Sequence, residues 1–347
     1  MKSKKTLFIH IGTNKTGTSA IQLSLNGKRK ELAEKGLLYP SAGCAGDAHY
    51  DISRILGFDH GKQPAPDAER AAFLGRFEAE VEASRCETCV ISSENFVLPK
   101  NVELVRSYFT GFDCRIIVYF RRHDHWWLSA YSQAVKMVAQ PPWIRGFQGF
   151  LNFNHRKNSQ VGNYRALLDR WEKFFGRENI VVRPYEREQN QPDIIADFLS
   201  AIGCADHCSI FSESVIPNVN PSLDARSIFL LETFQRMKTD QNVRQALIDH
   251  VLKNADPQRK APYVSPEIRR RLVDENAQQY DYIARTYLNR PDGALFNDPL
   301  PEPDAAWANP EDPTIVEVAE IVAQVLTSPN GRSKSILRSI PPNSGAL

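Results

Sequence analysis

The chain has 347 residues, of which 42% are hydrophobic, and its 43 basic and 41 acidic residues leave a formal net charge of +2. This length and apolar content suffice to bury a substantial core. Because nucleic-acid-binding domains usually carry a concentrated basic excess, the balanced charge argues against nucleic acid as a partner. No apolar run approaches the roughly 20 residues that a membrane-spanning helix needs, so we predict no membrane span.

The basic amino-terminal stretch Met-Lys-Ser-Lys-Lys precedes an apolar run that is too short for a signal peptide and is interrupted by His10, Gly12 and Asn14. We therefore expect a cytoplasmic protein.

Two cysteine pairs have spacings that zinc sites also use, namely Cys86 with Cys89 and Cys204 with Cys208. However, Cys89 lies in an apolar run, where free cysteine behaves as a small buried hydrophobe. We therefore predict no metal site.

Apolar runs alternate with helix-like segments along the chain. The runs predict buried strands at Leu7–Ile11, Thr88–Ser92, Cys114–Phe120 and Ile180–Pro184. The other segments predict helices at Ser19–Lys35, Ala68–Ser84, Trp127–Ala139, Tyr164–Phe175, Pro192–Ile202, Leu223–Met237 and Pro266–Thr286. Near-continuous apolar strands separated by helices are typical of a parallel sheet covered on both faces. We therefore predict a P-loop-like α/β fold of three layers, with a central, mostly parallel sheet flanked by helices.

The expected organisation is one domain over residues 1–327, with a core at about 5–205 and a helical carboxy-terminal part at about 206–327. The Pro-, Ser-, Gly- and Asn-containing end, 328–347, predicts a mobile tail. Residues 140–162, rich in Pro, Gly, Trp, Phe and Asn, predict a long loop, and loops of this length are usually functional or disordered. The role of this loop is left open.

The first predicted strand ends at Gly12, and a polar loop leads from it into a predicted helix. The loop consists of Thr13, Asn14, Lys15, Thr16, Gly17, Thr18 and Ser19. A strand, a turn rich in Gly, Thr and Lys, and a helix start form a cradle for phosphate, because main-chain N–H groups and the helix dipole attract an anion. This pattern predicts binding of a phosphorylated nucleotide.

The cradle departs from the P-loop of nucleoside triphosphatases, GxxxxGK[ST], at one position. Gly12 and Gly17 keep the spacing, but Thr18 replaces the lysine, and the lysine of this chain is Lys15, inside the loop. The lysine of triphosphatases reaches the β- and γ-phosphates, and a hydroxyl group holds Mg²⁺. The altered loop favours a shorter anion, with Lys15 near a bridging oxygen and the hydroxyl groups of Thr16, Thr18 and Ser19 as donors.

A second anion site is predicted after the strand Cys114–Phe120, where Arg121 begins a polar turn and Ser129 follows eight residues later. Ligands of open α/β sheets lie beyond the carboxyl ends of the strands, and a guanidinium group matches phosphate in a bidentate manner. We expect Arg122 to face the other way and to pair with a surface acid.

With these motifs the chain resembles sulfotransferases that use 3′-phosphoadenosine-5′-phosphosulfate (PAPS). The stretches HIGTNKTGTSAIQ and RRHDHWWLSAYSQ are similar to bacterial members that act on carbohydrate. The resemblance implies that the loop from Asn14 to Ser19 binds the 5′-phosphosulfate and that Arg121 and Ser129 bind the 3′-phosphate. It covers roughly residues 5–200.

The resemblance also implies a general base and a contact to the adenine. Some members carry a glutamate base after the corresponding strand, and Glu94 stands at that position, after Thr88–Ser92. An aromatic side chain near the adenine corresponds to Tyr185. Whether His49 approaches the acceptor is left open, and His10 is interpreted as a core residue.

Together with the two anion sites, the resemblance implies sulfuryl transfer from PAPS to an acceptor hydroxyl group, on a carbohydrate or glycan, with Glu94 as base, Lys15 at the leaving group and no metal. Two alternatives stay open, namely a kinase or NTPase with a degenerate P-loop and a non-catalytic nucleotide- or glycan-binding protein. The acceptor and the oligomeric state are not determined by the sequence.

Overall fold

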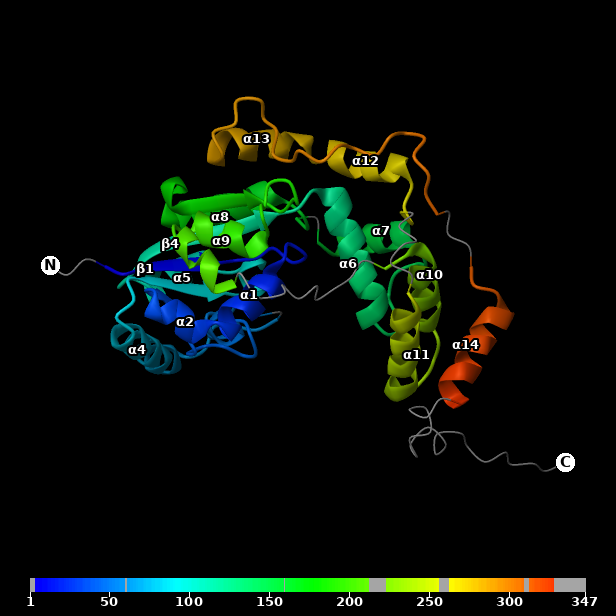
Figure 1. The fold of residues 1–347 in the computed structure, drawn as a ribbon, viewed down its shortest axis with the longest axis horizontal. Coiled ribbons are helices and arrows are strands. Elements are labelled where there is room, and N and C mark those ends of the chain that lie inside the picture. The colour runs from blue at the N-terminus through cyan, green and yellow to red at the C-terminus, as the bar shows by residue number, and fades with distance from the viewer. Residues whose placement is uncertain are drawn as a thin grey trace. The chain divides into compact units, whose positions relative to one another are not determined.

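The computed structural model describes residues 4–59, 61–158, 160–211, 223–255, 262–308 and 312–327 (Figure 1). The chain forms two compact units. The first consists of Met1–Trp126, Gly162–Val219 and Asp274–Pro299, and the second consists of Trp127–Val161, Asn220–Val273 and Leu300–Leu347. The single domain expected over residues 1–327 stays a prediction.

The first unit is built on a five-stranded parallel sheet with the strand order β2-β3-β1-β4-β5. Its strands are β1 (Thr6–His10), β2 (Leu37–Leu38), β3 (Thr88–Ser92), β4 (Asp113–Phe120) and β5 (Ile180–Pro184). All four predicted strands are therefore confirmed to within one residue at each end. The sequence analysis missed β2, because two residues show no periodicity.

Helices cover both faces of this sheet. Successive side chains of a strand point to opposite faces, so the contacts of Tyr119 and of its neighbour Phe120 identify the helices on each face. Phe8 and Tyr119 belong to a buried cluster with α1 (Thr18–Gly27), α2 (Arg29–Glu34) and α9 (Ile194–Ala201). On the other face Phe120 stacks on Tyr164 of α8 (Tyr164–Phe175), at 4.2 Å between the ring centroids. The α/β prediction, with its central sheet flanked by helices, is confirmed.

Shorter elements complete the first unit. They are α3 (Tyr50–Ile55), α4 (Asp67–Ala83), α5 (Val102–Tyr108), α13 (Ala277–Tyr287) and the 3-10 helices η1 (Glu94–Val97), η2 (Arg177–Asn179) and η3 (Ala205–Phe211). Aromatic side chains join several of them to the core, and Trp171 of α8 lies against Phe96 of η1 at 6.0 Å between the centroids.

The second unit consists of helices in its described part. They are most of α6 (His123–Met137), α7 (Phe147–Lys157), α10 (Ala225–Phe234), α11 (Gln241–Asn254), α12 (Pro266–Asp274) and α14 (Ile315–Thr327). The predicted loop at 140–162 is wrong in part, because it contains α7. Polar Gln and Asn residues between its aromatic residues obscure the helical period, although Phe147, Phe150 and Leu151 are buried.

Two long predicted helices are each divided in two. The helix predicted at Ser19–Lys35 is interrupted at Lys28, after Gly27, which has low helix propensity. The helix predicted at Pro266–Thr286 forms α12 and α13. The predicted tail, 328–347, lies outside the described residues.

Candidate functional site

The carboxyl ends of four neighbouring strands carry the residues that the sequence analysis singled out. The loop with Lys15 follows β1, Glu94 follows β3, Arg121 follows β4 and Tyr185 follows β5. Since all strands are parallel, these ends lie at one edge of the sheet. β1 and β4 lie side by side (Figure 1), while the chain continues from β1 to β2 and from β4 to β5, on opposite sides. Open α/β sheets bind ligands at such a reversal of strand order.

The loop after β1 curls around the amino end of α1. Its residues Gly12, Lys15 and Gly17 have φ angles of 96°, 68° and 77°, and Gly17 is the residue that caps α1. Among the described residues, the main-chain N–H groups from Thr16 to Ser19 have no main-chain acceptor. These N–H groups and the dipole of the ten-residue helix can together bind an anion.

Glycine is required at position 17 for a steric and a conformational reason. A Cβ atom there would lie 2.9 Å from the ring of Tyr185, and the left-handed backbone is itself unfavourable for other residues. The Tyr185 ring thus lies directly on the loop.

Three threonine hydroxyl groups stabilise the loop from inside. Those of Thr16 and Thr18 donate to the carbonyl oxygen of Thr13, at 2.5 and 3.0 Å, and that of Thr13 donates to the carbonyl of Tyr119 at 3.1 Å. The sequence analysis expected Thr16 and Thr18 to direct their hydroxyl groups to the anion. In this structure those groups bond the main chain, which leaves the main-chain N–H groups as donors, whereas Ser19 is exposed.

Arg121 contacts the same loop from β4. Its guanidinium group donates to the carbonyl oxygen of Lys15 at 3.1 Å and lies over the Tyr185 ring, 5.4 Å from the centroid. Trp126 donates from Nε1 to the carbonyl oxygen of Asn14 at 2.9 Å. The structure therefore brings Lys15, Arg121 and Tyr185 together.

Ser129 lies further along α6, in the part of that helix that belongs to the second unit. Its pairing with Arg121 around one phosphate stays a prediction.

Glu94 begins η1 and lies against the start of the loop. A Cβ atom on Gly12 would lie 3.4 Å from the Cα atom of Glu94. One carboxylate oxygen, Oε2, accepts two hydrogen bonds of 3.0 Å, from Nε2 of Gln22 and from the hydroxyl group of Tyr50. The sequence analysis identified neither donor, although Gln22 follows the loop by only one helical turn.

The two histidines of this region are buried and structural. His49 engages both ring nitrogens, because Nδ1 accepts from the main-chain N–H of Ser92 at 3.1 Å and Nε2 lies 3.0 Å from the carbonyl oxygen of Pro40. Burial lowers the pKa of His49 to about 3, and that of His10 also to about 3. Neither ring is placed to take a proton from a substrate.

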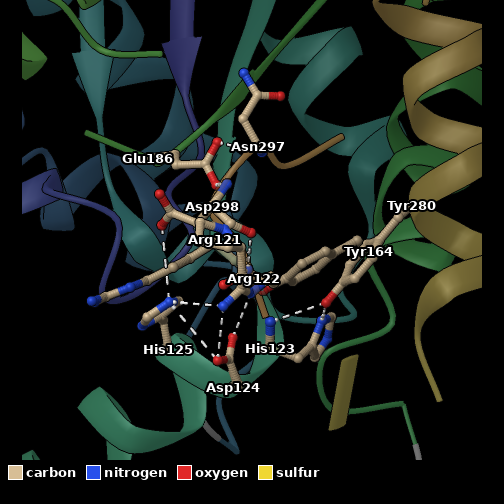
Figure 2. A network of polar contacts seen from close by, with 11 residues as sticks. Arg121, Arg122, His123, Asp124, His125, Tyr164, Glu186, Tyr280, Asn297 and Asp298 are labelled. Atoms are coloured by element: carbon tan, nitrogen blue, oxygen red, sulfur yellow. Dashed lines mark hydrogen bonds and ion pairs between the residues drawn. The ribbon is translucent and has the colours of Figure 1, made fainter. Parts of the chain in front are cut away.

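Arg122 faces away from Arg121, as expected, but its partner is a buried acid. It pairs with Asp124 through Nε at 2.8 Å and a second nitrogen at 3.1 Å, and both side chains are almost fully buried. Arg122 also donates to the carbonyl oxygens of Asp298 and Pro299, as part of the network in Figure 2. The expected surface acid is therefore wrong.

This network attaches the segment after α13 to the ends of β4 and β5. Glu186 accepts from the main-chain N–H groups of Asn297 and Asp298, at 2.7 and 2.6 Å. His123 is held between the Tyr280 hydroxyl group and the carbonyl oxygen of Gly162, at 2.5 and 2.8 Å. The turn that carries Arg121 is thus fixed by contacts on both sides.

We expect Arg122→Met to destabilise the protein by about 3–5 kcal/mol, because it removes the bidentate arginine partner of the buried Asp124 carboxylate. The measurement is the urea unfolding midpoint. The control is Arg165→Met, since Arg165 is exposed and surface changes usually stay within about 0.5 kcal/mol. Equal midpoints for the two variants would show that the Arg122–Asp124 pair does not stabilise the fold.

Three further observations concern ligands and membranes. All six cysteines are free, and the described residues contain no group of three or more His, Cys, Asp or Glu residues that could hold a metal ion. None of the helices in the described residues is long and apolar enough to cross a membrane.

No protein-family model matches the chain. An uncharacterised protein of Archaeoglobus fulgidus is 31% identical over 117 residues, which are 33% of this chain and 30% of that protein. The chain thus matches less than a third of that relative's length. The crystal structure of a sulfotransferase from Alicyclobacillus acidocaldarius covers 71% of this chain and 91% of its own, with 17% identity and a TM-score of 0.38. A likeness of that extent carries no information on the reaction.

Proposed function

We propose that this chain transfers the sulfuryl group of PAPS to an acceptor hydroxyl group. The observation that carries the proposal is the convergence at one sheet edge, where Arg121 contacts the main chain of Lys15 and Glu94 packs against Gly12. The two phosphates of the donor require an anion cradle and a second cationic group. The proton of the acceptor requires a base, and a carboxylate can serve as one.

Each group has one role in the proposed reaction. The N–H groups of the loop from Asn14 to Ser19 bind the 5′-phosphate, Arg121 and Ser129 bind the 3′-phosphate, and Tyr185 lies against the adenine. Glu94 takes the proton of the acceptor hydroxyl group as its oxygen attacks sulfur. The bond between sulfur and the bridging oxygen breaks, its electron pair stays on 3′,5′-adenosine bisphosphate, and Lys15 neutralises that charge.

The proposed chemistry needs no metal ion, because Lys15 covers the charge of the leaving group. A carbohydrate hydroxyl group is the proposed acceptor, on the strength of the resemblance of the two motif stretches to carbohydrate-acting sulfotransferases.

Calorimetry with two nucleotides tests the donor class. We expect the chain to bind 3′,5′-adenosine bisphosphate at least about tenfold more tightly than ATP, since one phosphate–guanidinium interaction supplies about 1.5–3 kcal/mol. Arg121→Ala is expected to abolish that preference. The control is Arg165→Ala, because Arg165 also lies over a tyrosine ring, at 4.1 Å from the centroid.

Two outcomes of this experiment would contradict the proposal. Tighter binding of ATP with Mg²⁺ would favour a kinase or NTPase. Bisphosphate binding with no sulfuryl transfer from PAPS to any of a panel of sugars and simple alcohols would favour a binding protein.

A further inference from the structure

The carboxylate of Glu94 has two oxygens in different surroundings. Oε2 accepts from Gln22 and from Tyr50, each at 3.0 Å, whereas Oε1 has no hydrogen-bond partner among the described residues. A carboxylate that acts as a base needs one oxygen directed to the substrate, and the other oxygen can be used to hold the group in place. The asymmetry at Glu94 has this form.

Gln22 is itself fixed by a buried polar pair. Its Nε2 atom carries two hydrogens, of which one is donated to Glu94 and the other to Oγ of Ser92, at 3.0 Å. Because an ionised carboxylate only accepts, the amide nitrogen of Gln22, not its oxygen, must face Glu94. Ser92 in turn shares a hydrogen bond of 2.8 Å with Nδ1 of His10.

His10, which bonds Ser92 and so holds Gln22 in place, is neutral at neutral pH. His10 is completely buried in the sheet and packs edge-on against Phe198, at 5.4 Å between the centroids. Burial lowers the pKa of His10 to about 3, so the ring stays neutral. Gln22 is also buried, and its side chain therefore has little freedom to turn away.

Tyr50 supplies the second donor from α3. Burial, followed by the charge of Glu94, raises the pKa of Tyr50 to about 12, so that its hydroxyl group remains a donor. Glu94 also acts on Tyr39, whose pKa is raised by burial and to a smaller extent by the charge of Glu94, and Arg54 lies over the Tyr50 ring, 5.6 Å from its centroid.

We propose that Gln22 and Tyr50 are positioning residues, which hold Oε2 of Glu94 so that Oε1 is the oxygen that takes the acceptor proton, with Ser92 and His10 fixing Gln22 from below. The assignment of Oε1 rests on the proposed function. The clamp on Oε2 does not, because it is a property of the protein without substrate.

The clamp can be measured without any activity. The mobility of the Glu94 side chain is measured in the full chain by ¹³C relaxation of its labelled Cγ methylene group, whose signal is assigned with a Glu94→Gln spectrum. Loss of one of the two donors to Oε2 should let the side chain turn, so Tyr50→Phe and Gln22→Leu should each lower the order parameter of this group into the flexible range, below about 0.6. Two controls remove similar donors elsewhere: Tyr108→Phe, because Tyr108 donates to a main-chain carbonyl, and Gln245→Leu, because Gln245 donates to Asp249.

The kinetic part separates positioning from folding and donor binding. Both variants should lower kcat by about 10- to 100-fold, consistent with loss of part of the roughly 10²–10⁴-fold that a general base contributes. The affinity for 3′,5′-adenosine bisphosphate should stay within about twofold of the wild type, which also shows that the variant is folded.

The outcomes of the two parts are distinct. An unchanged order parameter of the Glu94 side chain in the folded Tyr50→Phe variant overturns the clamp. A lowered order parameter with unchanged kcat supports the clamp but overturns the role of Oε1 and, with it, Glu94 as the base of the proposed reaction. If wild-type protein transfers no sulfuryl group, the proposed function fails, and the relaxation measurement still decides the clamp.

Discussion

Glu94→Gln should abolish most sulfuryl transfer while leaving the donor site intact. The amide keeps the size of the carboxylate and can still accept from Gln22 and Tyr50, but it cannot take a proton. We expect kcat to fall by about 10²–10⁴-fold, the range that general-base catalysis supplies. The affinity for 3′,5′-adenosine bisphosphate should be nearly unchanged, because the proposed phosphate contacts are on the loop and on Arg121.

The measurement is release of 3′,5′-adenosine bisphosphate from PAPS in the presence of an accepted alcohol, together with calorimetry. Glu103→Gln is a matched control, because Glu103 lies in the first turn of α5, away from the loop, with its side chain exposed. If Glu94→Gln retained kcat within threefold of the wild type, another group would have to take the proton.

Lys15→Ala should give the second large loss. In the proposed reaction negative charge builds up on the bridging oxygen as the bond to sulfur breaks, and Lys15 is the cation assigned to it. By analogy with the removal of one preorganised donor from an oxyanion hole, kcat should fall by about 10²–10³-fold. Since the charge develops mostly in the transition state, the KM for PAPS should change much less than kcat.

The control for Lys15 is Lys28→Ala. Lys28 lies at the junction of α1 and α2, where it pairs with Glu31 at 3.1 Å on the surface. Surface pairs of this kind contribute little, so both kcat and stability should be unchanged. Full turnover of PAPS by Lys15→Ala would contradict the role assigned to this lysine, and a loss confined to KM would assign it to ground-state binding only.

The two anion sites could be predicted from local sequence patterns, in the order in which they occur along the chain. The apolar run that ends before Gly12 and the helix predicted from Ser19 can be recognised without tertiary information, because apolar periodicity and turn residues are local features of the sequence. The same applies to Arg121 at the end of β4. Their location at the same edge of the sheet also follows once the strands are parallel. Their contact, the 3.1 Å bond from Arg121 to the Lys15 carbonyl oxygen, further requires that β1 and β4 be neighbours, which the sequence does not show.

The direction of the threonine hydroxyl groups could not be predicted. Thr16 and Thr18 carry hydroxyl groups of the kind that bind phosphate, but in the structure both donate to the carbonyl oxygen of Thr13. A hydroxyl group rotates to the best acceptor within reach, and whether that acceptor is a carbonyl or a ligand depends on a loop conformation that spacing alone does not fix. Likewise, Asp124 follows Arg122 by two residues, yet the sequence does not show that both side chains are buried or that Arg122 also binds the segment after α13.

The sequence by itself determined the parallel α/β architecture, the loop at the amino end of α1 and the positions of Glu94, Arg121 and Tyr185 at strand ends, because these depend on short-range periodicity and on strand direction. The tertiary structure alone decided which groups surround Glu94. Gln22 comes from α1, Tyr50 from α3 and Ser92 from β3, and the sequence separation of 72 residues between Gln22 and Glu94 means that only the packing of α1 against the sheet brings them together. Polar contacts across such separations have no local signature, because the sequence around a glutamine or a glutamate is the same whether the side chain bonds water or another side chain.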